Sequence, residues 1–373
     1  MKVLMTGGGT AGHINPAIAI ANTIKKNIPD AEIAFVGTAR GLENKLVPKE
    51  NYPLYHVEVM GFERSLSLKN IKAAYLAFVS PIKAKKLIEE FRPDIVIGTG
   101  GYASWPVLKA ASKMGIPSAV HESNALPGLA IRKLQGSVDR IFVNFKQTEQ
   151  YITEKEKVMY VGNPLRGGFG GLDYDEARKR LGIKKNQTLI LSFGGSLGAH
   201  RINEAALNFM NSCVKKMPNV IHYHATGSTD FKEFSEKFKE YGLEKCPNTR
   251  LVEYIHDMPL RMSAADVVIC RAGAMTISEI AMMKKACVMI PSPNVVDNHQ
   301  YKNAKVLADA DAVVMLEEAY LNDEIFCEEI LSLVNDAEKR KKLSENVAGF
   351  ARSDANKLIF DEILRLVQKG TKK

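Results

Sequence analysis

The stretch TGGGTAGH, residues 6–13, decides the fold because its glycines join a predicted strand to a predicted helix. A short apolar run, Val3–Met5, precedes the stretch. Ile14–Lys26 follows it with apolar residues on one helical face, and Asn15 before Pro16 is the expected N-cap. Glycine tolerates positive φ, and the first N–H groups of a helix attract anions. The stretch therefore predicts a strand–turn–helix unit that holds a phosphate.

The alternation of strand and helix continues outward from this turn. Strands separated by helical stretches of this length predict a parallel sheet covered on both faces. In the first half of the chain, further strands are predicted at Glu32–Val36, Asp94–Ile97, Ser118–Val120, Arg140–Asn144 and Val158–Val161.

The pattern restarts in the second half. Thr188–Phe193 is a predicted strand, GGSLG at 194–198 repeats the glycine turn, and Arg201–Val214 is a predicted helix. We therefore expect two doubly wound, Rossmann-like α/β domains, residues 1–163 and 164–340, joined at the Pro/Gly-rich residues 162–168. A charged helical segment, 341–373, could pack back on the first domain. The remaining strands are predicted at Val220–His224, Thr249–Tyr254, Val267–Cys270, Val288–Ile290 and Val313–Leu316.

Bulk composition favours a cytoplasmic protein with an anionic partner. The 373 residues carry a formal charge of +9, which suits nucleic acid, a phosphorylated substrate or a membrane surface. No apolar run approaches the ~18 residues of a membrane-spanning helix, and the N-terminus lacks the apolar core of a signal peptide. The five cysteines are scattered without C-x-x-C spacing, so we expect reduced thiols.

The first glycine turn formally contains the dinucleotide fingerprint G-x-G-x-x-G. A dinucleotide site also needs an acidic residue at the end of the second strand, where this chain has VGTAR at 36–40. This disfavours NAD, although Arg40 leaves an NADP site open. The sequence contains no G-x-x-x-x-G-K-[ST], which excludes a P-loop NTPase.

His13 is a candidate general base. It stands at the start of a predicted helix, where the helix dipole disfavours a proton on the ring, and a neutral imidazole suits proton removal from a sugar hydroxyl. A histidine that merely closes the loop is the alternative.

The second half carries candidate groups for a sugar nucleotide. The turn at 194–198 offers a second anion site, although every doubly wound domain has a tight first turn. In CRAGAMTISE, residues 270–279, Glu279 can accept both hydroxyls of a ribose, whereas a solvent-facing helical glutamate is the alternative. The polar loop 291–300 has amide and imidazole groups suited to sugar hydroxyls. No D-x-D pair ends a strand, so we expect no metal-held diphosphate.

Seven motifs occur in order over residues 1–305. Together they resemble the MurG family, bacterial transferases that move GlcNAc from UDP-GlcNAc to lipid I and so make lipid II. The motifs are GGGTAGH at 7–13, GTGGY at 98–102, HESN at 121–124, GNPLR at 162–166, GGSLGA at 194–199, CRAGAMTISE at 270–279 and DNHQ at 297–300.

The resemblance implies a GT-B fold with the site in an interdomain cleft, inverting transfer, and no cofactor or obligatory metal. It implies His13 or Glu122 as the base, with Gly9, Tyr102 and His121 on the acceptor side. Thr10 and Asn124 would line that side too and, with Gly12, contribute to the donor site. The other implied donor contacts are Arg166, Ser196, Ile255, Ala274, Met275, Thr276, Glu279, His299 and Gln300.

The chain departs from the family's sequence pattern at two positions, and three other functions are alternatives to this one. The family usually has glutamine where this chain has Leu197 and Ser123, and both departures remove an amide side chain. The rivals are a UDP-sugar transferase acting on diacylglycerol, a UDP-GlcNAc epimerase, and a non-catalytic sugar-nucleotide sensor. The sensor would not need His13 or the acceptor-side motifs.

Lipid I is membrane-bound, so we expect a peripheral protein on the cytoplasmic face, with anionic lipid and the cell-wall synthesis machinery as partners and no nucleic acid. An amphipathic basic segment, residues 66–87, is the candidate contact. Core packing is the alternative for its apolar residues. The segment combines Leu66, Leu68, Ile71, Tyr75, Leu76, Phe78, Val79, Ile82 and Leu87 with Lys69, Lys72, Lys83, Lys85 and Lys86.

Overall fold

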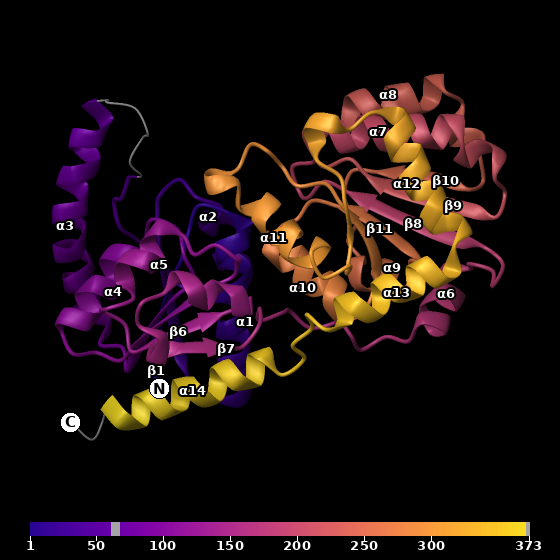
Figure 1. Cartoon of the computed structure of the whole chain (residues 1–373). Coiled ribbons are helices and arrows are strands. Elements are labelled where there is room, and N and C mark those ends of the chain that lie inside the picture. The colour runs from indigo at the N-terminus through magenta and orange to yellow at the C-terminus, as the bar shows by residue number, and fades with distance from the viewer. Residues whose placement is uncertain (61–67, 371–373) are drawn as a thin grey trace. The chain divides into compact units, whose positions relative to one another are not determined.

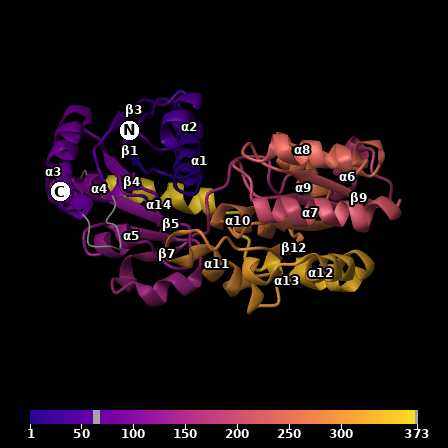
Figure 2. The same ribbon diagram turned by 90° about the horizontal axis from the view of Figure 1, so that it is seen from above.

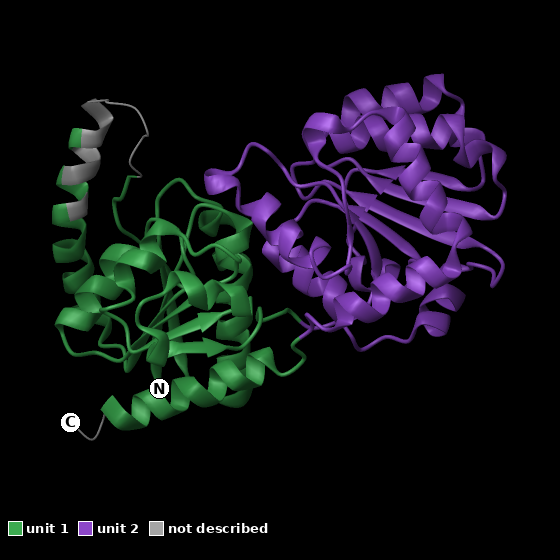
Figure 3. Ribbon diagram, in the orientation of Figure 1, with its two compact units in different colours: residues 1–166, 352–373 green, residues 167–351 purple. Residues whose placement is uncertain are grey.

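The computed structural model describes residues 1–60 and 68–370, without the side chains of residues 68–70, 72–74 and 77. The chain divides into two compact units, Met1–Arg166 with Arg352–Lys373 (unit 1) and Gly167–Ala351 (unit 2), coloured separately in Figure 3. The sequence placed the divisions after residues 163 and 340, and the structure places them after Arg166 and Ala351.

Over its described residues, unit 1 contains a seven-stranded parallel sheet in the order β3-β2-β1-β4-β5-β6-β7 (Figure 1). The strands are β1 Lys2–Thr6, β2 Glu32–Gly37, β3 Leu54–His56, β4 Ile95–Gly98, β5 Ser118–Glu122, β6 Arg140–Val143 and β7 Val158–Tyr160. The helices are α1 Ala11–Asn27, α2 Glu43–Lys49, α3 Leu68–Phe91, α4 Ser104–Lys113, α5 Leu129–Leu134 and α14 Ala355–Gly370, with short 3₁₀ turns η1 Lys146–Tyr151 and η2 Lys155–Lys157.

Alternation along the strands explains why helices cover both faces of this sheet. In β1, Val3 and Met5 pack in one apolar cluster and Leu4 packs in another. The first cluster is completed by α1 and by α14, which lie side by side. The second is completed by α3, α4 and α5, and α3 lies alongside α4 (Figure 2). The predicted apolar stripe of the last helix therefore faces the core of unit 1.

Unit 2 has a six-stranded parallel sheet within its described residues, in the order β10-β9-β8-β11-β12-β13. The strands are β8 Thr188–Phe193, β9 Val220–Ala225, β10 Thr249–Val252, β11 Val267–Cys270, β12 Ala286–Met289 and β13 Val314–Met315. The helices are α6 Tyr174–Leu181, α7 His200–Ser212, α8 Phe231–Glu240, α9 Met258–Ala264, α10 Ala274–Met283, α11 His299–Ala308, α12 Asp323–Asn335 and α13 Ala337–Ala348, with 3₁₀ turns η3 Val214–Lys216, η4 Leu243–Lys245, η5 Val296–Asn298 and η6 Glu318–Tyr320.

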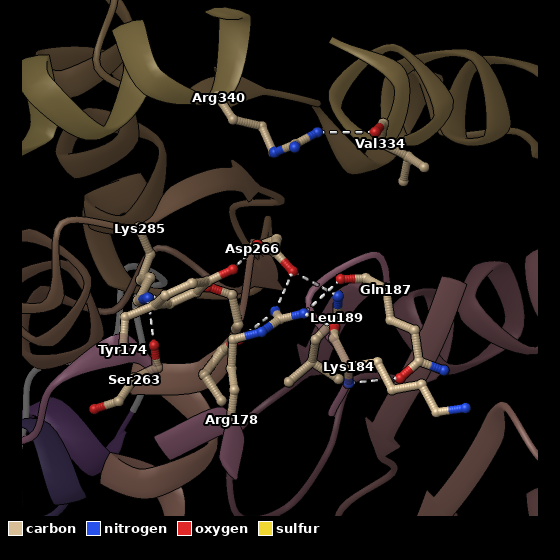
Figure 4. Close-up of polar contacts among 12 residues, drawn as sticks. Tyr174, Arg178, Lys184, Gln187, Leu189, Ser263, Asp266, Lys285, Val334 and Arg340 are labelled. Carbon is tan, nitrogen blue, oxygen red and sulfur yellow. Dashed lines mark hydrogen bonds and ion pairs between the residues drawn. The ribbon is translucent and has the colours of Figure 1, made fainter. Parts of the chain in front are cut away.

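A polar cluster around the buried side chains of Arg178 and Lys285 fixes α6 to the sheet of unit 2 (Figure 4). Asp266, the residue before β11, accepts hydrogen bonds from Arg178 Nη1 at 2.8 Å, from the Leu189 amide at 2.7 Å and from the Tyr174 hydroxyl at 2.6 Å. Lys285 donates nearby to the carbonyls of Ser263 and Ala265. Burial lowers the pKa of Lys285 to about 8, an effect that the charge of Asp266 opposes. The cluster joins the first helix of the unit to β8 and β11.

The structure corrects two expectations in unit 1. Strand β3 was not predicted, because it is short and two of its three residues are exposed. Helix α1 begins at Ala11, with Thr10 as its N-cap, so Asn15 is not the cap and Pro16 lies inside the helix. The extended backbone of Thr10 supplies a carbonyl that accepts from the His13 and Ile14 amides, and this starts the helix earlier.

Candidate active site

In each sheet the strand order changes direction at the first strand of the unit, β1 in unit 1 and β8 in unit 2. In unit 1, β2 and β4 flank β1, and in unit 2, β9 and β11 flank β8. Ligands of doubly wound sheets bind beyond the carboxyl ends of the strands at such a switch point. The motifs lie there: residues 7–13 follow β1, 98–102 follow or end β4, 194–198 follow β8, and 271–279 follow β11. Each unit therefore presents glycine-rich backbone at its switch point.

His13 lies in the first turn of α1, as predicted. Its Nδ1 lies 3.1 Å from the Gly8 carbonyl oxygen and 3.4 Å from Thr10 Oγ1. A carbonyl oxygen only accepts, so Nδ1 carries the hydrogen and donates to Gly8. The neutral ring then has its lone pair on Nε2. Gly12 and Thr10 are neighbours on the same exposed turn.

The motif at residues 98–102 packs against this turn. Thr99 Oγ1 donates to the His13 carbonyl at 2.7 Å. A Cβ on Gly100 would lie 2.7 Å from His13 Cδ2, and one on Gly101 would lie 2.3 Å from the Gly8 carbonyl oxygen. Both glycines have positive φ, 102° and 79°. Only glycine can approach this closely, and the next residue, Tyr102, is exposed.

Glu43, at the start of α2, accepts a hydrogen bond from the same turn. No sequence motif pointed to this residue. Its Oε2 accepts from the Gly9 amide at 2.9 Å, and its Oε1 accepts from the amide and hydroxyl of Thr38 at 2.7 and 2.8 Å. The residue is fully buried. Burial raises the pKa of this carboxyl, but the hydrogen bonds from Thr38 and Gly9 outweigh it and leave the pKa below its ordinary value.

The motif at residues 121–124 ends β5 and is largely buried. Glu122 Oε1 accepts from the amide and side chain of Asn124, and its Oε2 accepts from the Gly128 amide. Burial raises the pKa of Glu122 against these hydrogen bonds. His121 Nε2 donates to the Gly162 carbonyl at 2.9 Å, and burial lowers the pKa of His121 to about 4. The geometry shows Glu122 ordering its own loop, and its use as a base stays a prediction.

Ser123, where the family usually has glutamine, is a small buried residue here. Its hydroxyl lies 3.4 Å from His121 Nδ1. Arg166 ends unit 1 and donates to the Asn15 side chain of α1 at 3.0 Å, with Glu50 at 3.9 Å. Arg166 therefore contacts α1, the helix that follows the first glycine turn. Its contact with a donor diphosphate stays a prediction.

In unit 2 the glycine turn after β8 is shaped by close backbone contact. Gly198 has φ of 95°, and a Cβ there would lie 2.0 Å from the Thr226 carbonyl oxygen. Gly195 also has positive φ, 103°, but a Cβ there would meet open space. Ser196 and Leu197 are exposed at the tip. The contact with Thr226 thus fixes the base of the turn and leaves its tip accessible.

The turn after β11 leads into α10 with Gly273 as an N-cap that has no side chain. Ala274 is buried, whereas Met275, Thr276 and Glu279 are half-buried in the first turns of α10. A helix N-terminus attracts phosphate, and a carboxylate on the same face can accept ribose hydroxyls.

The last predicted donor residues follow β10 and β12. Ile255 follows β10 and is buried, so only its backbone could contact a base. His299 Nδ1 lies 2.9 Å from the Val296 carbonyl and donates to it, which leaves the lone pair of a neutral ring on Nε2. Gln300 Oε1 accepts from the Ser292 amide at 2.9 Å, which turns its NH₂ group away from that contact. Nowhere in residues 1–60 and 68–370 do three His, Cys, Asp or Glu side chains gather to hold a metal ion.

Family models match both units. Residues 3–143 match the glycosyltransferase family 28 N-terminal domain, and residues 189–359 match the glycosyltransferase family 28 C-terminal domain. This chain belongs to glycosyltransferase family 28.

Two curated relatives of this family 28 glycosyltransferase are similar over nearly their full length. A protein of Acetivibrio thermocellus is 42% identical over 370 residues, 99% of both chains. A protein of Thermoanaerobacter sp. is 41% identical over 360 residues, 96% of this chain and 98% of the relative. Both are named UDP-N-acetylglucosamine--N-acetylmuramyl-(pentapeptide) pyrophosphoryl-undecaprenol N-acetylglucosamine transferase. The predicted resemblance to the MurG family is confirmed.

Solved structures confirm the fold of the family 28 enzyme. MurG of Acinetobacter baumannii is similar with a TM-score of 0.77 and 25% identity, over 98% of this chain and 99% of that one. A UDP-GlcNAc 2-epimerase from Neisseria meningitidis has a TM-score of 0.64 at 17% identity, which shows the shared fold alone. The predicted GT-B class, with two Rossmann-like parallel-sheet domains, is therefore confirmed.

Proposed function

We propose that this enzyme transfers GlcNAc from UDP-GlcNAc to the C4 hydroxyl of MurNAc in lipid I, the undecaprenyl-pyrophosphoryl-MurNAc-pentapeptide, and so forms lipid II. The observation that carries the proposal is the 42% identity over 99% of the chain to a transferase named for this donor and acceptor. The epimerase likeness stands at 17% identity or less and supports no activity.

Unit 2 would bind the donor at its switch point. The turn at Gly194–Gly198 and the N-terminus of α10 follow the neighbouring strands β8 and β11, and a diphosphate would bind beyond the carboxyl ends of these strands. Glu279 would accept the ribose hydroxyls, and the backbone of Ile255 would contact uracil. His299 and Gln300 would contact the GlcNAc hydroxyls through the ring Nε2 and the side-chain NH₂ group. Ser196 and Arg166 would contact the diphosphate.

Unit 1 would bind the acceptor and supply the base. The C4 hydroxyl of MurNAc attacks C1 of GlcNAc opposite the departing UDP, so the configuration at C1 inverts. His13 Nε2 takes the proton of that hydroxyl as the new bond forms. The bond from C1 to the diphosphate oxygen breaks, and UDP leaves with the electron pair. Helix N-termini and Arg166 stabilise its charge, and we expect no obligatory metal.

An exposed apolar ridge on α3 supports a peripheral membrane contact. Ile71, Tyr75, Phe78 and Ile82 recur at helical spacing and are 61–78% exposed, whereas Leu76 is buried. Core packing therefore accounts for the face of α3 that carries Leu76, and membrane contact is proposed for the exposed face. Lys83, Lys85 and Lys86 are exposed on the same helix, and such a combination binds anionic lipid. None of the described helices is long and apolar enough to cross a bilayer. Leu66 lies outside the described residues, as do the side chains of Leu68, Lys69 and Lys72.

One incubation tests the proposed reaction. Radiolabelled UDP-GlcNAc is offered with a lipid I analogue or with diacylglycerol, and the lipid products are separated. Label in the lipid I product alone supports the proposal. Label in diacylglycerol, or in neither, contradicts it.

A vesicle experiment tests the membrane contact. We expect the Phe78→Ser, Ile82→Ser variant to pellet less with phosphatidylglycerol vesicles than the unchanged protein. Tyr320→Ser removes an equally exposed aromatic side chain from unit 2 and should leave pelleting unchanged. Equal pelleting of all three proteins would remove α3 from the membrane contact.

A further inference from the structure

Glu43 and His13 bind opposite ends of one peptide group. The Gly9 amide donates to Glu43 Oε2 at 2.9 Å, and the Gly8 carbonyl of the same peptide bond accepts from His13 Nδ1 at 3.1 Å. The N–H and C=O of a trans peptide point in opposite directions. The carboxylate and the imidazole are therefore joined through a single planar unit.

We propose that Glu43 is a positioning residue for transfer, acting on His13 through the Gly8–Gly9 peptide. This inference rests on the proposed role of His13 as the base. An amide that donates to a carboxylate is polarised, and its carbonyl oxygen becomes a stronger acceptor. The Gly8 oxygen thus keeps the hydrogen on His13 Nδ1 and the lone pair on Nε2, the atom that takes the acceptor proton.

The surroundings of Glu43 fix its direction. Its side chain fills a space left by Gly8, Gly37 and Gly41, where a Cβ would lie within 2.6 Å of a Glu43 atom. Oε1 is occupied by both donors of Thr38, so Oε2 is the oxygen that faces Gly9. Gly9 itself has a positive φ, 89°, which glycine adopts readily.

On its carbonyl side, the Gly8–Gly9 peptide packs against the backbone of the turn after β4. Gly101 approaches the Gly8 carbonyl so closely that a Cβ would lie 2.3 Å from its oxygen, and Gly100 lies against the His13 ring. Thr99 holds the His13 carbonyl at 2.7 Å. The peptide is thus fixed between Glu43 and the turn after β4, which leaves it little freedom to rotate.

Glu43→Gln removes the charge and one accepting oxygen of the side chain while it keeps the shape. Glutamine keeps the volume but has one accepting oxygen, so it cannot serve both Thr38 and Gly9. We expect kcat to fall about 10- to 100-fold, less than the ~10⁴-fold cost where a carboxylate contacts a catalytic histidine directly. The donor KM should change less than kcat, because most of the proposed donor contacts, from Ser196 to Gln300, lie in unit 2.

The matched control is Glu362→Gln. Glu362, on α14, is also a buried carboxylate of unit 1, and it pairs with Arg140 of β6 and with Arg365 of its own helix. This variant should lower thermal stability and leave kcat unchanged. If it lowers kcat as Glu43→Gln does, the loss reflects general loosening of unit 1, and the inference is overturned.

A spectroscopic readout does not depend on activity. Long-range ¹H–¹⁵N spectra of the ¹⁵N-histidine-labelled protein should show neutral His13 with its hydrogen on Nδ1, and Glu43→Gln should populate the other tautomer. A hydrogen on Nε2 in the unchanged protein overturns the inference. If Glu43→Gln does not fold, Glu43→Asp, which keeps the charge but shortens the side chain that reaches the Gly9 amide, should shift the tautomers in the same direction. An unshifted spectrum in Glu43→Asp would then overturn it.

A double-mutant cycle distinguishes the two proposals. If Glu43 acts through His13, Glu43→Gln should cost less than about two-fold in kcat when His13 is already alanine. An equal cost in both backgrounds overturns the inference and leaves the base role intact. Near-normal turnover of His13→Ala, with the Nδ1 tautomer observed, instead overturns the base role while the hydrogen-bonded arrangement stands.

Discussion

Removing the Asp266 carboxylate should destabilise unit 2 strongly. In Asp266→Ala, Arg178, which is 4% exposed, loses its counter-charge while keeping carbonyl acceptors from Lys184 and Gln187. The Leu189 amide and the Tyr174 hydroxyl lose their acceptor as well. Lys285 is then a second buried cation without an anion beside it.

The magnitude follows from that environment. Removing one partner of a buried ion pair costs about 3–5 kcal/mol, because the remaining charge stays out of water. For a unit of this size, 1 kcal/mol corresponds to about 2–4 °C, so the midpoint of unit 2 should fall by about 6–20 °C. Thermal unfolding followed by calorimetry measures this change.

Asp257→Ala is the matched control. Asp257 pairs with Arg261 one helical turn away, and both side chains are partly exposed, so the cost should be below about 1 kcal/mol. The joint replacement Arg178→Met, Asp266→Leu should recover part of the loss, because it removes the unpaired charge of Arg178 and leaves only that of Lys285. If Asp266→Ala costs no more than Asp257→Ala, the cluster does not stabilise α6 as we infer.

Three further predictions concern the site and acid stability. Glu279→Ala should raise the donor KM about 10- to 100-fold with a smaller effect on kcat, since it removes hydrogen bonds to a charged acceptor; an unchanged donor affinity removes Glu279 from the site. His121 and His224 are buried with each pKa lowered to about 4 by burial. The unfolded chain therefore binds protons first as the pH falls below ~6.5, and stability should drop by about 2 kcal/mol per histidine from pH 7 to pH 5. A flat unfolding midpoint over that range would contradict this. Gly198→Ala should lower stability and donor affinity together because its Cβ meets the Thr226 carbonyl, whereas Gly195→Ala, which meets open space, should cost only its positive φ, about 1–2 kcal/mol. Equal losses in the two variants would show that the close contact is unimportant.

Local patterns were enough to predict the fold and the glycine turns. Residues 6–13 and 194–198 join strand to helix, and the structure places both at a switch point. Positive φ at Gly9 and Gly198 agrees with that pattern, because a turn of this kind depends on a few consecutive residues. The sheets could be predicted for the same reason, except for β3, which is too short and exposed to give a periodic signal.

Contacts between distant segments could not be predicted. Glu43 looks like an ordinary helical glutamate, and its role as an acceptor depends on Gly9 approaching from another strand–helix turn. The apolar stripe of the last helix indicated a buried face, but not that α1 would cover it. Asp266 and Arg178 are likewise far apart in sequence, and only the packing of α6 on α9 brings them together.

Unit 1 is built from two segments of the chain that are separated by unit 2, and this affects the order in which the units can fold during synthesis. Unit 1 draws part of its first apolar cluster from Ile359, Ile363 and Leu366 on α14, after the whole of unit 2 in the chain. A ribosome therefore releases all of unit 2 before α1 can meet its last partner. Unit 2, a contiguous segment, can fold during synthesis, while the unit with the proposed base holds an uncovered apolar face until translation passes α14. The order of synthesis thus makes the proposed catalytic unit the later of the two to mature.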